Sequence, residues 1–298
     1  MHNEQEKNTN HKSSIKRITL IGLVINLFLF IVKLLLGIYG RSQALTADAF
    51  HTLSDVTTDF SIIFGVKLWE KPPDDNHPYG HRRIEAIITV FICAMLTFAA
   101  FSLGYNAIIS LKGERGSPPE FVAIIGAVLS IIFKEFLYRW NLKIGRREKS
   151  KAVIANAWHH RTDALSSIPV ALAILASVIN EKLTFLDQVT ALLVSFFILY
   201  AAYKLFKSAL LEIVVTGLSK RDKADINSLI LSVKDVKSVH ALRSRQMGSG
   251  WFVDLHIQVD ANMTVKEGHK IAESVKRMLI EKGPDIVDVM VHIEPDNE

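Results

Sequence analysis

Long apolar runs alternate with short polar stretches up to about residue 215. The runs lie at 18–39, 86–104, 121–140, 168–179 and 189–205. Several approach the ~20 apolar residues with which a helix crosses the hydrocarbon core of a bilayer. No run of this kind follows Thr216. The pattern predicts an integral membrane protein whose C-terminal part lies outside the bilayer.

The runs extend to six predicted transmembrane helices, at 15–39, 42–69, 83–111, 120–144, 153–179 and 183–211. The second and fifth carry ionisable residues at membrane depth, so we expect a strict hydropathy threshold to miss both. The first run is too long for the core of a signal peptide and lacks a small-residue cleavage site, so we interpret it as a retained span. The predicted domains are a polar N-terminal tail over 1–14, a transmembrane domain over 15–214 and a cytoplasmic domain over 215–298.

The periodicity after residue 218 is typical of a small α+β domain. Apolar residues recur at helical spacing in 224–233 and 265–282 and alternate with polar ones in 251–259 and 286–294. Gly248 and Gly250 mark a turn before the first alternating segment. With a further strand near 236–245, the predicted order is αββαβ.

Composition and charge agree with a membrane location. Of the 298 residues, 49% are hydrophobic, and the net charge is +5. The basic residues cluster before the first predicted span and between alternate pairs of spans, which by the positive-inside rule places the N-terminus and the C-terminal domain in the cytoplasm, at the plasma or inner membrane. This placement speaks against nucleic acid as a partner. The single cysteine, Cys93, lies in an apolar run, so no intrachain disulfide forms and a thiolate metal site has little support.

The second predicted helix carries a stripe of ionisable residues. Spacings of three and four residues place them on one helix face: Asp48, His51, Asp55 and Asp59. A charge at the bilayer centre costs at least ~2.5–3.5 kcal/mol on insertion scales. The carboxylates therefore need a partner, either a metal ion or a buried lysine such as Lys33 or Lys134.

The fifth predicted helix repeats the spacing with His159 and Asp163. Two i,i+4 pairs on facing helices supply two imidazoles and two carboxylates, a set that matches near-tetrahedral Zn²⁺. The neighbouring His160 and Arg161 are expected to point elsewhere, toward a cytoplasmic vestibule.

Two further groups of potential ligands lie outside the spans. Asp74, His77 and His81 fall on a proline-containing loop, where a solvated loop without metal is the alternative. In the tail, His256 and His292 fall on the polar faces of their strands, and Glu294 shares the face of His292. The alternative for the tail is a set of scattered surface histidines.

Several segments together resemble the cation diffusion facilitator family: LTADAFHTLSDV, DDNHPYGHRRIEA, AWHHRTDALSS and the tail pattern HALRSR, DLHIQVD, VHIEP. The resemblance runs from the first span to about Pro295. It implies a homodimer with a ferredoxin-like tail and a transport site in the second and fifth spans. The metal ligands that it implies are His51, Asp55, His159 and Asp163 for transport, Asp74, His77 and His81 in the loop, and His240, His256, His269, His292 and Glu294 in the tail. Some bacterial members carry aspartate at the positions of His51 and Glu294.

The expected function is efflux of a divalent cation, zinc foremost, in exchange for protons by alternating access. Protons compete with metal for imidazole and carboxylate ligands, so a proton gradient can drive export. Cd²⁺, Co²⁺, Fe²⁺ and Mn²⁺ bind related ligand sets. The alternative is a membrane-anchored metal sensor whose tail binds metal. An enzyme is not expected, because four facing ligands leave no obvious open coordination position.

Overall fold

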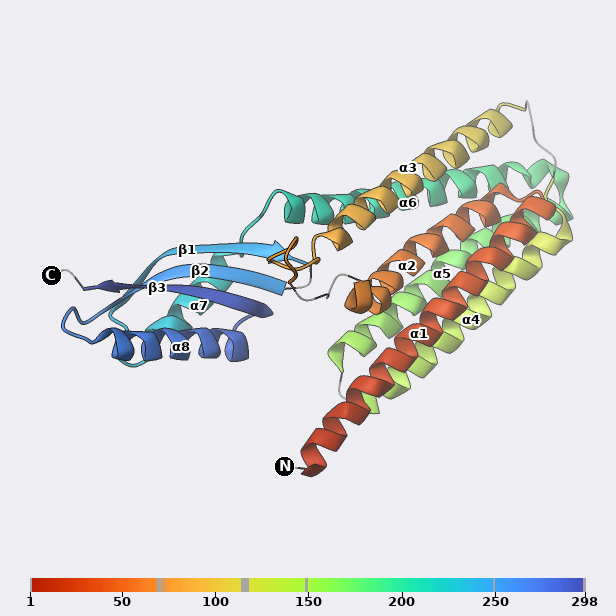
Figure 1. The fold of residues 1–298 in the computed structure, drawn as a ribbon. Helices are drawn as coiled ribbons and strands as arrows, with labels where there is room; N and C mark the ends of the chain where they lie inside the picture. Colours follow the sequence, from red (N-terminus) through yellow and green to blue (C-terminus); the bar gives the residue numbers. More distant parts are fainter. Residues whose placement is uncertain are drawn as a thin grey trace. The chain divides into compact units, whose positions relative to one another are not determined.

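The computed structural model describes residues 2–68, 71, 73–113, 118–147, 150–248 and 250–296, and only the backbone at 2–17, 19, 57–68 and 151–152. Six long helices make up the first part (Figure 1). They are α1 (His2–Tyr39), α2 (Gln43–Leu68), α3 (Ile84–Leu111), α4 (Phe121–Arg147), α5 (Lys151–Ile179) and α6 (Phe185–Ile213), with a short 3-10 helix η1 (Glu181–Leu183) before α6. The prediction of six transmembrane helices is confirmed, although α1 extends back to His2 through most of the expected polar tail.

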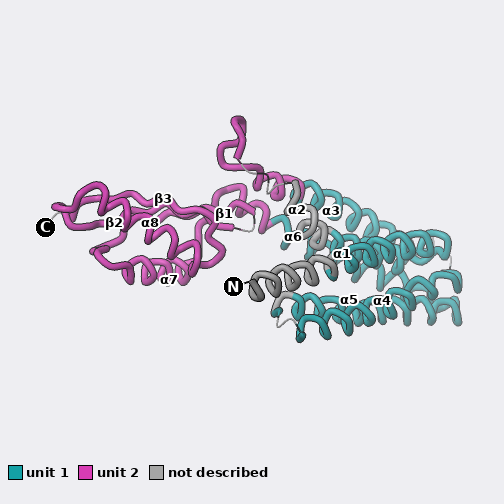
Figure 2. Tube along the Cα trace, turned by 60° about the horizontal axis from the view of Figure 1, so that its bottom comes forward, with its two compact units in different colours: residues 1–70, 89–206 teal, residues 71–88, 207–298 magenta. Residues whose placement is uncertain are grey.

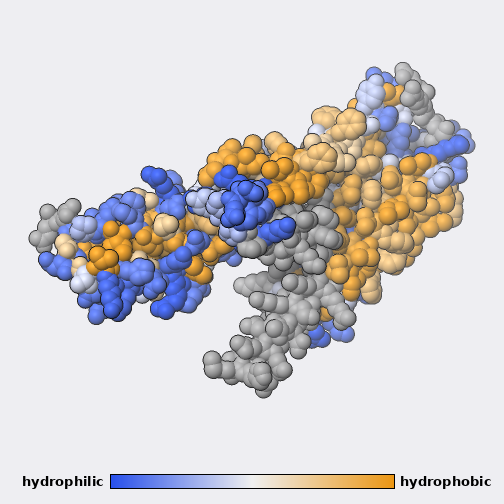
Figure 3. All heavy atoms as spheres, in the orientation of Figure 1, coloured by the Kyte–Doolittle hydropathy of each residue, from blue (hydrophilic) through white to orange (hydrophobic). Residues whose placement is uncertain are grey.

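Within the described residues, five helices are long and apolar enough to cross a membrane: α1, α3, α4, α5 and α6. The helix α2 is not among them, but the side chains at 57–68 lie outside the described residues, so the predicted effect of its ionisable stripe stays a prediction. The expectation that the fifth helix would also be missed is wrong, because the apolar second half of α5 outweighs its polar first half. Exposed apolar side chains cover the outer surfaces of the long helices, including Phe98 at 79% and Tyr105 at 66% exposure, as a lipid-facing surface requires (Figure 3).

The helices α1, α2, α4 and α5 lie side by side (Figure 1). Small residues let the backbones approach, as is common between membrane helices. A Cβ atom at Gly37 of α1 would lie 2.6 Å from the Thr46 hydroxyl of α2, so glycine is required there. The core is rich in alanine and includes Ala44, Ala47, Ala127 and Ala191.

Asp187, in the first turn of α6, caps the start of α2. Its carboxylate accepts hydrogen bonds from the Ser42 hydroxyl at 2.6 Å and from the Gln43 backbone amide at 2.8 Å. The first amides of a helix have no partner within the helix, and an anion stabilises that end of the helix dipole. The buried Asp187 thereby fixes the helix that carries His51 and Asp55.

The C-terminal part is an α+β domain in the predicted order αββαβ. It consists of α7 (Lys220–Leu231), β1 (Ser238–Met247), β2 (Gly250–Val259), α8 (Val265–Lys282) and β3 (Ile286–Pro295). The central strand β2 pairs with β1 antiparallel and with β3 parallel. Alternate side chains of β2 point into a core that both helices share. This core includes Val253, Leu255 and Ile257 of β2, Ile230 of α7 and Leu279 of α8. The other sheet face is polar, in agreement with the predicted alternation.

The chain divides into two compact units (Figure 2). The first comprises 1–70 and 89–206, and the second comprises 71–88 and 207–298. The segment after α2 thus belongs with the C-terminal domain, and Tyr79 of this segment stacks against the guanidinium of Arg245 on β1 at 5.2 Å from the ring centre.

Candidate metal-transport site

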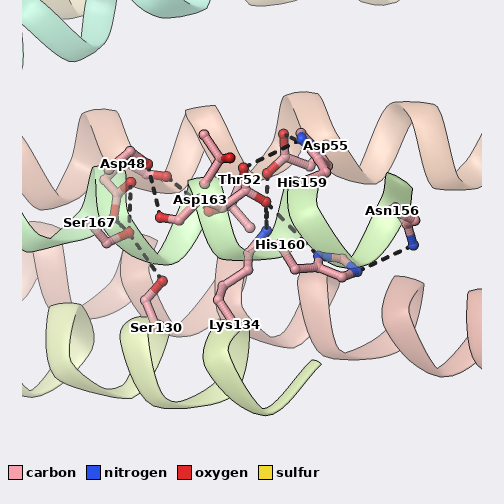
Figure 4. Close-up of polar contacts among 12 residues, drawn as sticks. Asp48, Thr52, Asp55, Ser130, Lys134, Asn156, His159, His160, Asp163 and Ser167 are labelled. Atoms are coloured by element: carbon pink, nitrogen blue, oxygen red, sulfur yellow. Dashed lines mark hydrogen bonds and ion pairs between the residues drawn. The ribbon is translucent and has the colours of Figure 1, made fainter. Parts of the chain in front are cut away.

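The predicted transport ligands come together between α2 and α5. Ligand atoms of His51, Asp55 and Asp163 lie within 4.8 Å of one another. His159 lies beside them, with Nε2 at 3.6 Å from Asp55 Oδ1 and Nδ1 at 3.7 Å from Asp163 Oδ1 (Figure 4). The two i,i+4 pairs thus face each other as the helical spacing predicts.

The environment of these side chains suits a cation. The carboxylates of Asp55 and Asp163 are each 7% exposed, so their charges are largely removed from solvent. Among the described residues, Nδ1 of the His51 ring is buried without a hydrogen-bond partner. A buried polar atom without a partner costs about 1–3 kcal/mol, a cost that ligation would relieve. The group offers the nitrogen and carboxylate donors that late first-row divalent metals prefer.

Lys134 of α4 also occupies this site. Its ammonium donates to Asp163 Oδ2 at 2.8 Å and to Asp55 Oδ2 at 3.1 Å, and the side chain is 1% exposed. Figure 4 shows Lys134 pointing from α4 toward α5 and α2. The lysine partner that the sequence offered as an alternative to metal is therefore present together with the predicted metal ligands.

A second buried ion pair lies nearer the N-terminal end of α2. Asp48 Oδ2 lies 2.7 Å from the Lys33 ammonium of α1, and Lys33 also donates to the Thr52 hydroxyl at 3.0 Å. Ser167 of α5 donates to Asp48 at 3.1 Å, and its hydroxyl lies 3.4 Å from that of Ser130 on α4 (Figure 4). Asp48 therefore has partners from both α1 and α5. The side chain of Asp59 lies outside the described residues.

The expectation for His160 is wrong. Its side chain is 1% exposed, with Nδ1 at 4.0 Å from Asp163 Oδ2. It lies between α5 and α1, where a Cβ atom at Gly22 would be 3.9 Å from its ring. Arg161 does point away from the site, with its guanidinium over the Tyr138 ring at 4.7 Å.

The three predicted loop ligands also form a group. His77 Nδ1 and His81 Nε2 lie 3.1 Å and 3.4 Å from the two carboxylate oxygens of Asp74. Partial desolvation of Asp74 favours its neutral form, but hydrogen bonds from the backbone amides of His77 and Asn76 and from the His77 ring outweigh it, so the pKa of this carboxyl lies below its ordinary value. The carboxylate is thus kept ionised between two imidazoles.

In the tail, three histidines lie in one row across the sheet. His240 of β1 is paired in register with His256 of β2, which is paired with His292 of β3. Glu294 bridges the row, at 3.0 Å from His240 and 2.7 Å from His256. The hydrogen bond from His256 holds the pKa of Glu294 below its ordinary value. The fifth expected ligand, His269, is on α8, where its imidazole is 3.7 Å from Glu273, and it does not join this group.

Comparisons with known proteins agree with these features. Residues 19–214 match the model of the cation efflux transmembrane domain, and residues 218–296 match that of the cation efflux protein cytoplasmic domain. The manganese efflux system protein MneP of Bacillus subtilis is 27% identical over 94% of this chain and 96% of its own. Metal tolerance protein C1 of Arabidopsis thaliana is 31% identical over 94% of this chain and 62% of its own. Magnetosome protein MamB of Magnetospira sp. is 30% identical over 88% and 89%, respectively.

Proposed function

The chain belongs to the cation efflux family, and from this premise we propose that it exports a divalent transition metal through a site formed by His51, Asp55, His159 and Asp163. Efflux of divalent metal cations across a membrane is the activity of the family, which is one of transporters and not of enzymes. The convergence of the two helical pairs carries the assignment of the site, because three of the four residues place ligand atoms within 4.8 Å of one another and His159 adjoins both carboxylates.

Zinc is the cargo that the donor set favours. Two imidazoles and two carboxylates match four-coordinate Zn²⁺, with bonds of about 2.0–2.2 Å. Manganese is the second candidate, because a relative that aligns over almost its full length is named a manganese efflux protein. Mn²⁺ prefers oxygen ligands and higher coordination numbers, so a competition between the two ions tests the role of the imidazoles.

Proton exchange is the coupling that this chemistry supports. Metal ligation requires neutral imidazole and ionised carboxylate, so a proton and a metal ion cannot use the same ligand at once. An unperturbed imidazole titrates near pH ~6.5, within the range that membranes maintain. An inward proton gradient would then drive metal outward as the site alternates between the two sides.

The remaining features fit a cytoplasmic regulatory domain. The basic residues between alternate pairs of spans support a cytoplasmic location for both termini by the positive-inside rule. The loop group around Asp74 and the tail row bridged by Glu294 would bind the same metal from the cytoplasm, and the tail would hold two copies of the chain together as a homodimer. This arrangement also leaves room for the rival function, a sensor in which only the tail responds to metal.

Metal flux in proteoliposomes tests the proposal. Asp163→Ala removes a carboxylate from the site and should abolish Zn²⁺ uptake into inside-out vesicles at an imposed pH gradient. The matched control is Asp222→Ala, which removes an exposed carboxylate from α7. Flux that survives Asp163→Ala would show that the site is misplaced, and wild-type protein that binds Zn²⁺ without moving it would favour the sensor.

A further inference from the structure

We propose that Lys134 is a tethered cation that occupies the metal-free transport site and competes with the incoming divalent ion for the carboxylates of Asp55 and Asp163. The inference rests on the proposed function, because it concerns the same site. It adds a residue from a third helix, α4, to the ligands supplied by α2 and α5. Lys134 is a determinant of affinity and supplies no ligand atom to the metal.

The contacts of the ammonium support this role. It bridges the two carboxylates at 2.8 and 3.1 Å and uses one oxygen of each, Oδ2, while the Oδ1 atoms face His159. A metal ion shared by both carboxylates would lie within a few ångströms of the ammonium, because bonds to carboxylate oxygens are about 2.0–2.2 Å long. Two cations that close repel each other strongly where solvent is excluded.

The charge balance points the same way. Two carboxylates and one ammonium give the site a formal charge of −1. A divalent ion added beside the ammonium would make it +1, whereas a divalent ion that displaces the ammonium would leave it neutral. Two cations beside the same pair of carboxylates repel each other where solvent is excluded, so metal binding favours movement of Lys134 away from the carboxylates.

The movement that we infer for the ammonium is toward Ser130. Ser130 lies four residues before Lys134, one turn away on the same face of α4, and its hydroxyl is in contact with Ser167, which donates to Asp48. Long side chains on a helix lean toward its N-terminal end, so a rotation of Lys134 toward Ser130 follows the usual direction. The flexible four-carbon stem of lysine permits this movement.

The tethered cation also explains how the site can exist empty. Without it, Asp55 and Asp163 would be two like charges close together in a largely buried site, which is unfavourable. A transporter must return its site across the membrane after releasing the ion. The ammonium stabilises that state, and by weakening metal binding it also promotes release.

Calorimetry with Zn²⁺ on the full-length protein in detergent tests the inference. The background should lack the loop and tail groups, through His77→Ala, His81→Ala, His240→Ala and His256→Ala, so that the transport site is measured. In that background Lys134→Met should bind Zn²⁺ at least about tenfold more tightly, since one adjacent charge changes the proton affinity of a group by about tenfold to a thousandfold. In proteoliposomes its KM should fall and its kcat should fall with it, because release becomes slow.

Two matched variants separate charge from packing. Lys134→Arg keeps the positive charge and should not tighten binding. The double variant Arg139→Gln/Glu135→Gln removes an ion pair elsewhere on α4 and should leave the affinity unchanged. Tightening in Lys134→Arg equal to that in Lys134→Met, or the same tightening in the double variant, would overturn the inference.

The remaining outcomes distinguish this inference from the function on which it rests. If Asp163→Ala abolishes binding but Lys134→Met leaves affinity unchanged or weaker, the site stands and the tethered cation is wrong. If Asp163→Ala leaves binding intact, the site itself is wrong.

Should Lys134→Met unfold when it is purified without metal, Zn²⁺ added during purification should rescue it, and its melting temperature should rise more with Zn²⁺ than that of the wild type. Failure of that rescue counts against the inference, because the metal is expected to replace the missing charge.

Discussion

The buried pair of Lys33 and Asp48 gives a prediction whose size follows from the structure. The substitution Lys33→Met keeps the apolar stem but removes the ammonium, which lies 2.7 Å from Asp48 with both side chains no more than 2% exposed. Breaking a buried pair from one side costs about 3–5 kcal/mol, because a charge stays buried without its partner. The hydrogen bond from Ser167 to Asp48 remains at 3.1 Å and places the expected loss near the lower end, at about 3 kcal/mol.

Thermal unfolding in detergent, followed by circular dichroism, measures this loss. A loss of about 3 kcal/mol corresponds to a melting temperature lower by about 6–12 °C for a protein of this size. The second change, Asp48→Asn, removes the stranded charge, so the double variant should recover most of the loss and should still transport metal. A single variant as stable as the wild type would refute the buried pair. A double variant that folds but no longer transports metal would place Asp48 on the path of the ion.

Three further predictions address the helix cap, the cargo and the tail. Asp187→Ala should lower stability by about 1–3 kcal/mol and speed amide exchange in the first turn of α2, while Asp187→Asn, which keeps an acceptor, should lose less. His51→Asp should raise the Mn²⁺ flux relative to the Zn²⁺ flux, because carboxylate suits Mn²⁺ better than imidazole does, and unchanged relative rates would remove His51 as a selectivity element. Glu294→Gln should weaken Zn²⁺ binding by the isolated tail, residues 219–298, whereas His269→Ala should not, and equal effects in calorimetry would contradict the observed group. The pKa of Glu294 is lowered in the folded tail, so its stabilising effect should be complete above the ordinary glutamate value of about 4.3 and vanish as the pH falls through the lowered value. The melting temperatures of the wild-type tail and of Glu294→Gln should therefore converge in acid.

The sequence predicted the grouping of the proposed ligands because their spacing determines the helix face. Residues four apart lie on the same face of a helix, both on α2 and on α5. Because these polar faces belong to otherwise apolar helices, they are expected to pack against each other. The grouping of His51 and Asp55 with His159 and Asp163 therefore needed little knowledge of the packing. The helix that supplies the counter-charge is determined by how α4 packs against α5. The spacing of residues along the chain does not predict this packing.

Lys134 shows this limit. A single lysine in an apolar run has no periodic partner, so the sequence offered it and Lys33 as equal candidates for pairing with the carboxylates of α2. In the structure, Lys33 forms an ion pair with Asp48, and Lys134 forms ion pairs with both Asp55 and Asp163. His160 was misplaced for a related reason, because its surroundings depend on the close approach of α1 at Gly22.

In the tail, alternation predicted the shared face of His292 and Glu294 but not the complete row. His240 joins His256 only because of the register between β1 and β2, which shifts between His240 and Arg243, where Ala241 has a positive φ of 49°. Such an irregularity leaves no clear trace in the pattern of apolar residues. The inclusion of His269 came from the concentration of histidines in the tail and from the family resemblance, and its helix carries it away from the row within one chain.

The two buried lysines differ in how completely they neutralise their partners, and this difference distinguishes the Lys33–Asp48 pair from the proposed transport site. Asp48 has one ammonium of its own and a hydrogen bond from a serine hydroxyl, so its charge is balanced within the protein. Asp55 and Asp163 share a single ammonium, which leaves a deficit of one positive charge beside two imidazoles. A divalent ion gains more where buried negative charge is only partly balanced, and it can leave again where a tethered cation is ready to take its place. The proposed transport cycle requires both properties, and in the described spans they coincide at Lys134.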